Sequence, residues 1–525
     1  MSNKNILLIE PGYKNKYPPL GLMKIASYHG PHGKKDKVTF IKGLENKNIF
    51  KVNWDRIYVT SLFSFEWDEI SKTIDYALSI VNGDASRIFV GGIAASLMHG
   101  SFLEVTKWRG VRFIKGLLGE SPPDALQLDE FDEDLYADDH DHPPIEDLVP
   151  DYSILDQIAD DYVYPVNDAY FAYASRGCVR KCHFCGVPKL EGAQRDAKSI
   201  TALVNGIIER YGEKKDLMLM DNNVVASANY QNIIAEIRGL GFERGAKLSR
   251  GRSNLQRRVD FNQGVDARIL CKDIMYLKEM STIAIKPLRI AFDHIGARKP
   301  YETAIRMSHE VGIHELSNYM LYNFTDSPSD LYQRMRLNID LNEELKIRIF
   351  SFPMRYQPTD MKNRSFIGKK WTKFELRSVQ TILQATHGVV SGSPDFFKNA
   401  FGENEEKFHD LLIRPNHYLF NRAWYEKYDG RSEFEEFLGK FKRLNDENKK
   451  ELAQLLSTVP NSKVSGIIGK ASDSKVNGIL PYYVRLEKEE ELYIWKKAKE
   501  YRIEETNEVI PEDELVEDAG LQERV

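Results

Sequence analysis

The sequence predicts an α/β protein, and three features of its patterning support that prediction. Over the first 118 residues, short apolar segments alternate with helical patterns. Between about residues 161 and 370, six further apolar segments alternate with helical patterns in the same way. From about residue 371 onward the pattern is helical. Because strands that alternate with helices form parallel sheets, we expect a doubly wound parallel sheet, a second α/β region and a mostly helical C-terminal region.

The N-terminal sheet has five candidate strands, each a short run rich in apolar residues. They are Asn5–Ile9, Lys37–Ile41, Arg56–Thr60, Arg87–Val90 and Val111–Ile114, with helices at Gly21–Tyr28 and Glu66–Val81. Open parallel sheets bind ligands at the carboxyl ends of their strands. The candidate contact residues in the loops expected at that edge are Pro19, Gly21, Gly91 and Gly92.

A linker rich in Asp, Glu and Pro follows, from residue 119 to about 160. It contains the acidic run Asp129–Asp134 and the mixed run Asp138–His142. Carboxylates and imidazoles at this density could hold a hard metal ion. Dense like charge also repels and stays extended, so we expect a solvated connection rather than a metal site.

The central region, residues 161–370, contains six strand–helix units. The expected strands are Tyr170–Ser175, Leu217–Met220, Phe261–Val265, Leu288–Asp293, Asn318–Phe324 and Lys346–Phe352. The expected helices are Ile200–Ile208, Tyr230–Ile237, Lys272–Met280, Tyr301–Val311 and Leu331–Leu341. In each of these helices the apolar residues recur at the spacing of one helix face.

An apparent insertion between Arg244 and Arg258 is strongly basic. Its cations are Arg244, Lys247, Arg250, Arg252, Arg257 and Arg258. A nucleic acid or another phosphate-bearing substrate could bind such a patch. No aromatic residues are interleaved to stack on bases, and the net charge is −5, so we favour a solvated surface loop.

Residues 371–525 are predicted to be helical, in amphipathic segments such as Phe374–Ala385 and Phe434–Leu456. The run Ser391–Pro394 separates one segment from the next, and the chain ends in an acidic tail. No run of eighteen apolar residues is present to span a bilayer. The N-terminal apolar run Ile6–Ile9 is too short for an export signal, so we expect a soluble, cytoplasmic protein.

Three of the four cysteines fall within eight residues, at Cys178, Cys182 and Cys185, and Phe184 precedes the last of them. The spacing is C-x3-C-x2-C. Three thiolates this close can ligate one inorganic cluster, and they are one short of the four that saturate a [4Fe–4S] cube. An iron without a protein ligand is an open coordination position, where metal centres carry out chemistry.

Other uses of these cysteines are less favoured. A zinc site usually has four ligands, often as two pairs, and no second pair follows at a suitable distance. Cys271 stands about ninety residues away in an apolar helical stretch, and we interpret it as a core thiol. Disulfides are not expected, because cysteine is scarce and no export signal is present.

The cysteine motif resembles the cluster loop of the radical S-adenosylmethionine (radical SAM) enzymes. The resemblance implies that Cys178, Cys182 and Cys185 bind a [4Fe–4S] cluster and that SAM chelates the fourth iron. It implies that an electron from an external flavodoxin- or ferredoxin-like reductant cleaves SAM to a 5′-deoxyadenosyl radical, which abstracts a substrate hydrogen atom. It also implies a partial (β/α)6 TIM-type barrel over residues 161–370. The C-terminal helices match no known motif, and we expect them to close the open side of this barrel and to shape substrate choice.

The N-terminal region is similar to the Rossmann-like, cobalamin-binding-type domain that precedes many radical SAM cores. The similar segments are Ile6–Gly12, Pro18–Leu22 and Val90–Leu97. The D-x-H-x-x-G motif that supplies a histidine to cobalt is absent. Two alternatives stay open: cobalamin binds without a histidine ligand, as the family tolerates, or the domain is a relic that shapes the substrate site.

Polar residues follow several of the central strands, where barrel enzymes carry their catalytic groups. Asp221 and Asn222 end the second strand, where the family usually has a Gly-Gly-Glu-like segment that contacts the amino group of SAM. Arg268 could pair with the SAM carboxylate. Together with the aromatic residue of the motif, the candidate SAM contacts are Phe184, Asp221, Asn222, Gln263, Asp266, Arg268 and Asp293. Each of the polar residues among them could equally be a satisfied structural polar group.

The resemblance leaves several reactions open. With cobalamin as methyl carrier, the enzyme would methylate an unactivated carbon; without it, rearrangement or C–C bond formation is the alternative. Methylthiolation is disfavoured, because it normally needs a second cluster with three more cysteines. A non-catalytic iron–sulfur or zinc module is the alternative from another class, but an electron carrier would normally saturate all four irons. The substrate is not identified by any motif.

Overall fold

The computed structural model of the chain describes residues 3–44, 48–118, 144–459 and 461–505. The chain divides into two compact units. Unit 1 comprises residues 1–291, 300–316 and 357–366, and unit 2 comprises residues 292–299, 317–356 and 367–525. The acidic runs Asp129–Asp134 and Asp138–His142 and the tail after residue 505 lie outside the described residues, so a solvated connection remains a prediction for residues 119–143. Residues 144–160 of the predicted linker instead include the short helices η5 (Ile145–Asp147) and η6 (Tyr152–Ile158), and the side chains of Tyr152 and Ile154 are buried.

Unit 1 begins with a five-stranded parallel sheet of strand order β2-β1-β3-β4-β5. Its strands are β1 (Asn5–Glu10), β2 (Lys37–Lys42), β3 (Arg56–Thr60), β4 (Ile88–Gly91) and β5 (Arg112–Phe113). Residues Ile6 to Ile9 of β1 are fully buried, as expected for a strand covered on both faces. The predicted doubly wound parallel sheet is confirmed.

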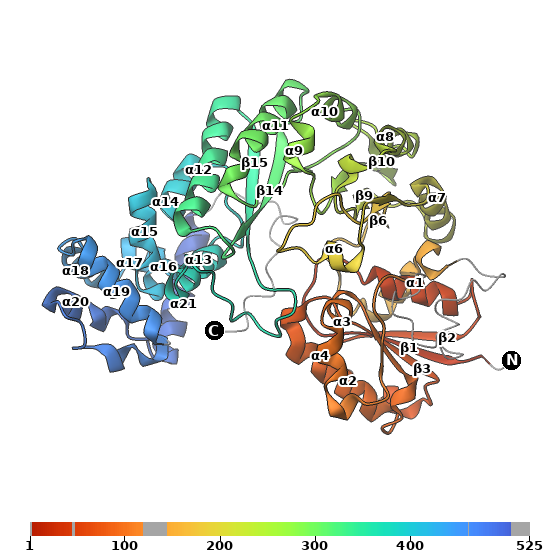
Figure 1. Cartoon of the computed structure of the whole chain (residues 1–525), viewed down its shortest axis with the longest axis horizontal. Helices are drawn as coiled ribbons and strands as arrows, with labels where there is room; N and C mark the ends of the chain where they lie inside the picture. The colour runs from red at the N-terminus through yellow and green to blue at the C-terminus, as the bar shows by residue number, and fades with distance from the viewer. Residues whose placement is uncertain (1–2, 45–47, 119–143, 460, 506–525) are drawn as a thin grey trace. The chain divides into compact units, whose positions relative to one another are not determined.

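Four helices accompany this sheet: α1 (Leu20–His29), α2 (Trp67–Ile80), α3 (Ile93–Leu97) and α4 (His99–Leu103). Figure 1 shows α1 on one face and α2 on the other. The α2 face is a core in which Leu7 and Ile9 of β1 pack with Ile70 and Ile74 of α2. The two long helices lie within two residues of their predicted limits.

Six strands of the central region alternate with helices in the predicted order within the described residues. The strands are β6 (Ala169–Ala172), β9 (Asp216–Leu219), β12 (Arg258–Phe261), β13 (Leu288–Arg289), β14 (Glu315–Tyr322) and β15 (Arg348–Arg355). The helices are α7 (Ile200–Tyr211), α8 (Tyr230–Gly239), α9 (Ala267–Leu270), α10 (Met275–Met280), α11 (Arg298–Glu310) and α12 (Pro328–Leu345). Strands β6, β9 and β12 pair in parallel in unit 1. The alternation is confirmed, and closure into a TIM-type barrel remains a prediction.

Strand β12 lies three residues before the predicted segment Phe261–Val265. It ends at Phe261, because Gly264 adopts a positive φ of 81° and turns the chain. The predicted strand Tyr170–Ser175 is likewise divided, into β6 and a separate two-residue strand, β7 (Ser175–Arg176).

The basic insertion is an antiparallel hairpin of β10 (Lys247–Arg250) and β11 (Ser253–Gln256), which corrects the predicted loop. Arg250 donates to both carboxylate oxygens of Asp168, at 2.7 and 3.1 Å. Arg257 donates to Glu213 at 2.7 Å. Because these cations serve contacts inside the fold, the hairpin is better suited to a surface element than to a nucleic-acid site.

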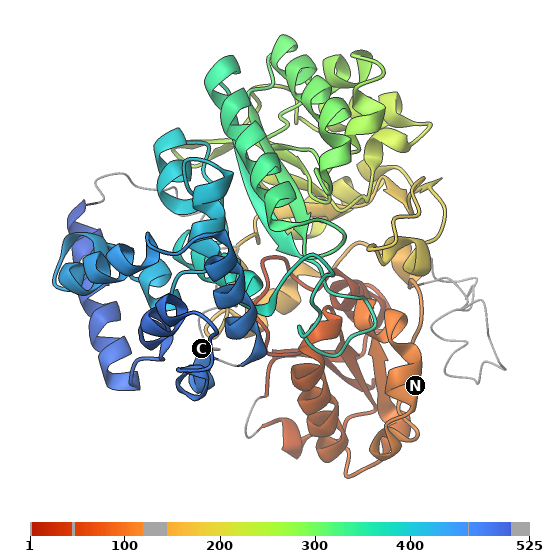
Figure 2. The ribbon, with the colours of Figure 1, turned by 60° about the vertical axis from the view of Figure 1, so that its left-hand side comes forward.

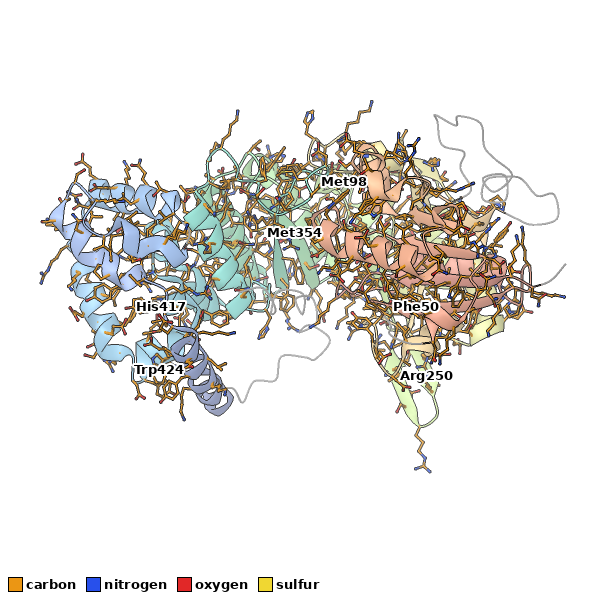
Figure 3. All side chains as sticks on the ribbon, turned by 90° about the horizontal axis from the view of Figure 1, so that it is seen from below. Phe50, Met98, Arg250, Met354, His417 and Trp424 are labelled. Carbon is orange, nitrogen blue, oxygen red and sulfur yellow. The ribbon has the colours of Figure 1, made fainter. Side chains whose placement is uncertain are left out.

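The C-terminal part of unit 2 is helical, as predicted, and is coloured blue in Figure 2. Its helices are α13 (Lys373–Ala385), α14 (Pro394–Phe401), α15 (Glu405–Leu412), α16 (Asn416–Phe420), α17 (Arg422–Lys427), α18 (Arg431–Phe441), α19 (Asp446–Thr458), α20 (Ser474–Ile479) and α21 (Lys488–Glu505). Their core combines aliphatic residues with aromatic ones such as Tyr418 and Trp424. Figure 3 marks Trp424 and the neighbouring His417.

Two helix limits in this region show how caps divide the chain. The predicted segment Phe434–Leu456 is two helices, because Asn445 begins α19 with a capping box. The predicted break at Ser391–Pro394 is confirmed: Ser393 caps α14, and Pro394 is its first residue. None of the helices in the described ranges has the length and apolar character to cross a membrane.

Candidate functional site

The three clustered cysteines lie on a loop between β7 and the one-turn helix α6 (Val187–Leu190), in unit 1. The base of the loop is closed by β7 and β8 (Arg195–Asp196), which pair antiparallel with Arg176 opposite Arg195. The Cys178 amide donates to the carbonyl oxygen of Gly192 at 3.3 Å. All three cysteines are half-buried and none forms a disulfide. The loop therefore presents three cysteine side chains, none of them in a disulfide, from a fixed base.

Gly177 makes this narrow base sterically allowed. Its φ is +72°, and a Cβ atom there would lie 2.1 Å from the carbonyl oxygen of Ala193. Neither the conformation nor the space accepts a side chain. The glycine that directly precedes the first cysteine is thus required by the backbone path of the loop.

The sulfur atoms already have donors around them. The Arg180 amide donates to Cys178 Sγ at 3.4 Å, and the Val187 amide donates to Cys185 Sγ at 3.5 Å. The pKa of the Arg268 guanidinium is raised, chiefly by its hydrogen bonds to Asp266 and in smaller part by Cys182. Amide donors and a nearby cation favour thiolate, which is the form that ligates metal.

Asp266 and Arg268, both predicted as SAM contacts, are paired with each other beside the cysteine loop. Asp266 accepts from Arg268 at 2.8 and 3.0 Å and from Arg180 Nε, on the loop, at 2.6 Å. Burial alone would raise the pKa of Asp266, but the hydrogen bonds from Arg268 and Arg180 outweigh it and hold the pKa below its usual value. The structure brings these residues to the loop, and their contact with SAM remains a prediction.

Asp221 is occupied by the chain that leads into the loop. Its carboxylate accepts from the Ala174 amide at 3.0 Å and from the Ser175 hydroxyl at 2.6 Å, and it also accepts from the Ser175 amide. It is 1% exposed, and burial raises its pKa to about 6. Its neighbour Asn222 donates to Glu191 at 3.0 Å. Both residues hold the base of the cysteine loop in this structure.

The remaining predicted SAM contacts are spread over the two units. Phe184 is half-buried within the cysteine loop, and Gln263 is exposed in the turn after β12. Asp293 belongs to unit 2, where it contributes to the electrostatic environment of Arg334. The structure joins Phe184, Asp266 and Arg268 in one neighbourhood and does not tie Gln263 or Asp293 to it.

The glycine turns of the N-terminal sheet lie at the carboxyl ends of its strands, as predicted. Gly91 ends β4, and Gly92 precedes α3 with a φ of +104° and no room for a Cβ against Ser61. Pro19 precedes α1, and Gly21 is exposed in its first turn. This edge of the sheet is the ligand-binding edge of parallel sheets in general.

The sheet and the cysteine loop are neighbours within unit 1. Figure 1 shows α3 beside α6, and a Cβ at Gly186 would lie 2.9 Å from Leu97 of α3. Close packing at Gly186, directly after Cys185, therefore brings the helix that follows the Gly91-Gly92 turn against the end of the cysteine loop.

Aromatic residues missed in the sequence surround the same edge of the sheet. Phe63 and Phe65, just after β3, stack at 5.2 Å between ring centroids. Lys362 and Arg364 lie over Trp67 and Phe65, each at 4.1 Å from the ring centroid. The alternation Phe63, Phe65, Trp67 was the signal in the sequence that could have indicated this aromatic cluster. It was not used, because aromatic residues are more often buried in the core than placed at a surface site.

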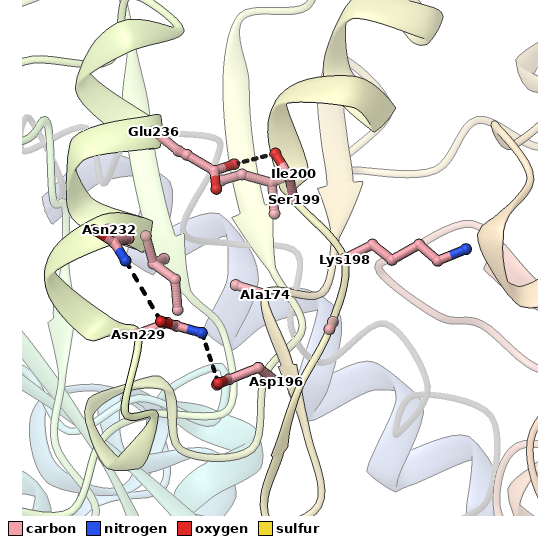
Figure 4. Close-up of a pocket in the computed structure, with 10 residues that line it drawn as sticks. Ala174, Asp196, Lys198, Ser199, Ile200, Asn229, Asn232 and Glu236 are labelled. Carbon is pink, nitrogen blue, oxygen red and sulfur yellow. Dashed lines mark hydrogen bonds between the residues drawn. The ribbon is translucent and has the colours of Figure 1, made fainter.

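A hollow of about 200 Å³ is lined by Asp196 of β8, by the start of α7 and by residues of α8 as far as Glu236 (Figure 4). Asn229 donates to Asp196 at 2.7 Å, and the Ser199 hydroxyl donates to Glu236 at 2.7 Å. These polar groups are satisfied by one another. The hollow contains none of the predicted site residues.

Gln194, which sequence reasoning also missed, provides a further test of whether this region accommodates a bound group. It lies in the returning strand between Gly192 and Arg195, across from Gly177. Both polar atoms of its side-chain amide are buried without a hydrogen-bond partner among the described residues. An unsatisfied buried amide is costly, and a bound polar group would relieve the cost.

Within the described ranges, no three or more His, Cys, Asp or Glu side chains are arranged to hold one metal ion. In a [4Fe–4S] cluster each protein thiolate binds a different iron, so three thiols that hold one cluster need not meet at one point. Three cysteines outside any disulfide, amide donors to two of their sulfurs and, at the base of the loop, the side-chain amide of Gln194, unpaired within the described ranges, fit such a cluster.

The sequence matches no protein-family model and no curated protein. Among solved structures, it is similar to the radical SAM methyltransferase TsrM from Kitasatospora setae with cobalamin and a [4Fe–4S] cluster bound, at 13% identity and a TM-score of 0.43 over 69% of this chain and 78% of that one. It is similar to Streptococcus suis SuiB bound to SAM, at 13% identity and a TM-score of 0.27 over 42% of this chain and 47% of that one. It is also similar to HydG, a maturase of the [FeFe]-hydrogenase, at 12% identity and a TM-score of 0.28 over 84% of this chain and 98% of that one. At these scores the similarities fix neither substrate nor reaction.

Proposed function

We propose that the chain is a radical SAM enzyme. The observation that carries the proposal is the C-x3-C-x2-C loop, with Phe184 before its last cysteine and with backbone amides directed at two of its sulfurs. When bound, a reduced [4Fe–4S] cluster supplies the electron that cleaves SAM to methionine and a 5′-deoxyadenosyl radical, and the radical takes a hydrogen atom from substrate. Cys178, Cys182 and Cys185 are the residues that would hold it.

The neighbouring residues position the loop and balance its charge. Arg180 and Arg268 bring two guanidinium groups to the loop, and Asp266 holds both of them. Cations near thiolates stabilise their charge, and a carboxylate between two arginines fixes the direction of both. Phe184 supplies an apolar wall within the loop itself. An external flavodoxin- or ferredoxin-like protein is the proposed electron source.

Methyl transfer that uses cobalamin is the finer proposal, and one observation favours it. Helix α3, which follows the Gly91-Gly92 turn, packs against Gly186 at the end of the cysteine loop. Helix α3 begins at the carboxyl edge of the N-terminal sheet and contacts the cysteine loop. A ligand bound at this edge would therefore lie on the side of the sheet that faces the loop. Cobalamin-free rearrangement or C–C bond formation is the alternative if this edge takes no corrinoid.

Anaerobic reconstitution with iron and sulfide tests the proposal. We expect about four irons and four sulfides per chain, and 5′-deoxyadenosine after addition of SAM and reductant. Replacement of Cys182 by Ala should abolish both, whereas Cys271→Ala, outside the loop, should change neither. Zinc in place of iron, or no 5′-deoxyadenosine from a fully loaded cluster, would overturn the radical SAM assignment.

A separate measurement decides the finer proposal. Uptake of micromolar cobalamin by the purified chain, followed by corrinoid absorbance after gel filtration, should be lost in Gly92→Val, which adds a side chain where the turn approaches Ser61. Gly83→Val is the matched control, because Gly83 has a positive φ and open space around it. No uptake by the unmodified chain would leave the cobalamin-free alternative.

A further inference from the structure

A chain of alternating charges runs from the N-terminal sheet domain to the base of the cysteine loop. Lys24 on α1 donates to Glu146 at 3.2 Å, in the short helix η5 (Ile145–Asp147). Glu146 also accepts from Arg176 on β7, and Arg176 donates to Glu191 at 3.4 Å. The side chains of Lys24, Arg176 and Glu191 are 6%, 10% and 8% exposed, and that of Glu146 is 26% exposed.

Glu191 is the branch point of this chain. One of its carboxylate oxygens accepts the backbone amide of Gly177 at 2.8 Å and the side-chain amide of Asn222 at 3.0 Å. The other faces Arg176. One carboxylate therefore joins the residue before the first cysteine, a buried arginine and the end of β9. Glu191 itself follows α6, at the far end of the same loop.

The charges along the chain compensate one another. Two ammonium or guanidinium groups alternate with two carboxylates, so the formal sum is zero. Arg176 is only two residues from Cys178 and also lies over the ring of Tyr173, at 3.2 Å. Without Glu191, its charge would be balanced by Glu146 alone, close to the thiols. A buried charge that loses its partner is energetically costly, so its side chain is expected to change position.

We propose that Glu191 is a positioning residue for the cysteine loop: it fixes the Gly177 amide and neutralises Arg176, and the Glu146–Lys24 pair anchors this arrangement to α1. The residue acts through the loop and does not touch the cluster. The inference rests on the proposed function only for its cluster-dependent part, because the contacts that carry it belong to the polypeptide alone.

Glu191→Gln is the decisive variant, because it keeps the size of the side chain and one carbonyl oxygen while it removes the charge. Glu236→Gln is the matched control. Glu236 also accepts several hydrogen bonds, from Ser199 and Thr201, but at the start of α7 and away from the cysteines. Circular dichroism and thermal unfolding establish that both variants are folded before any comparison.

The first readout is amide hydrogen exchange of the full chain without cluster, over residues 175–186. We expect exchange in this segment to be faster in Glu191→Gln, by on the order of tenfold, and unchanged in Glu236→Gln. Equal exchange in the two variants would overturn the positioning role. This readout decides the inference even if the chain never takes up a cluster.

The second readout uses the reconstituted protein. It measures the rate at which a chelator removes iron and the reduction potential of the cluster. Loss of a supporting contact behind the ligands typically costs 10–100-fold in metal affinity, so we expect iron loss from Glu191→Gln to be at least about tenfold faster. Removal of a negative charge should also shift the potential to more positive values. A potential equal to that of the unmodified protein would overturn the charge-balancing part.

Lys24→Met tests the distant end of the chain and guards against a misfolded Glu191 variant. It should speed amide exchange and iron loss as Glu191→Gln does, by a smaller factor, because the link between Glu146 and Arg176 is intact. Its reduction potential should shift in the opposite direction, to more negative values, because a positive charge is removed. No change in either readout for Lys24→Met would overturn the anchoring to α1. If the unmodified protein binds no iron, the proposed function fails while the exchange experiment still stands.

Discussion

Each unit contains a buried arginine that donates to at least one carboxylate, and the two arginines are used differently. In unit 2, Arg334 is 0% exposed and donates to Asp326 at 3.0 Å and to the carbonyl oxygens of Phe292 and Leu321 at 2.9 and 2.8 Å. In unit 1, Arg176 supports a loop whose cysteines are half-buried and whose neighbour Gln194 has a side-chain amide without a hydrogen-bond partner in the described part of the chain. Buried polar residues that follow strands therefore indicate a functional site only where neighbouring side chains are partly exposed or lack a hydrogen-bond partner.

The comparison also explains why burial alone did not separate the two kinds of site. Asp326 and Asp221 are both almost fully buried, at 5% and 1% exposure. Asp326 is one end of a closed ion pair that locks segments of unit 2. Asp221 receives only backbone amides and a hydroxyl, all from the two residues that lead into β7. The hydrogen bonds to Asp221 therefore fix the backbone path into the cysteine loop, whereas the Asp326–Arg334 pair stabilises the interior of unit 2.

The largest effect that separates the two regions is expected from the cysteines. Each of Cys178→Ala, Cys182→Ala and Cys185→Ala should abolish cluster binding, because the loss of one of three thiolates leaves two irons without a protein ligand. The free energy of unfolding of the apoprotein should change by less than about 1 kcal/mol, since these side chains are only half-buried. Iron analysis and urea unfolding check the two parts. A variant that keeps its iron would contradict the ligand assignment.

Arg334→Met should show the opposite pattern. Removing one partner of a buried ion pair typically destabilises a protein by about 3–5 kcal/mol, because the other charge is left buried. Urea unfolding or amide exchange in the segments around Asp326 measures the loss. The double variant Arg334→Met with Asp326→Asn should recover part of it. Iron binding by the folded variant is expected to be unchanged. Loss of iron as complete as in the cysteine variants would contradict the purely structural role of Arg334.

Asp221 gives a pH-dependent way to sharpen the comparison. Burial raises its pKa from 3.8 to about 6. A carboxyl whose pKa is higher in the folded protein stabilises the fold most at low pH, and this contribution is lost as pH rises through about 6. The stability of the unmodified protein relative to Asp221→Asn should therefore fall by up to about 3 kcal/mol between pH 4 and pH 7.

Urea unfolding of the two proteins at several pH values measures this difference, and the subtraction removes the titration of other groups. A difference that grows with pH would mean that the three donors from Ala174 and Ser175 stabilise the carboxylate more than burial destabilises it. In that case Asp221 would resemble the ion-paired Asp326 after all.

Local patterns in the sequence predicted the fold well where burial is simple. The strand β3 has its predicted limits, Arg56–Thr60, because its apolar residues lie in a sheet covered on both faces. The β10–β11 hairpin was missed, because most of its residues are polar and exposed and only Leu248 is fully buried. A pattern of buried and exposed residues cannot signal a strand that has no buried face.

The candidate site divides in the same way. The cysteines were found because their spacing is local, within eight residues of sequence. The supporting chain was missed because its contacts are not local: Arg176 meets Glu191 15 residues away and Glu146 30 residues away, and Lys24 meets Glu146 across 122 residues. Asp221 and Asn222 were predicted as SAM contacts, and the sequence could not show their hydrogen bonds to Ser175 and Glu191. Their contact with SAM remains a prediction.

Two glycines at the base of the cysteine loop provide the smallest and most local test. Gly177 and Gly192 have φ values of +72° and +75°, so alanine costs backbone strain at both, on the order of 1–2 kcal/mol. They differ in space: a Cβ at Gly177 would lie 2.1 Å from the Ala193 carbonyl oxygen, whereas nothing lies within 4 Å of one at Gly192. Gly177→Ala must therefore move the β7–β8 base, and Gly192→Ala need not.

We expect faster iron loss and faster amide exchange around Cys178 in Gly177→Ala than in Gly192→Ala. Equal effects would show that strain, and not the shape of the base, sets the hold on the loop.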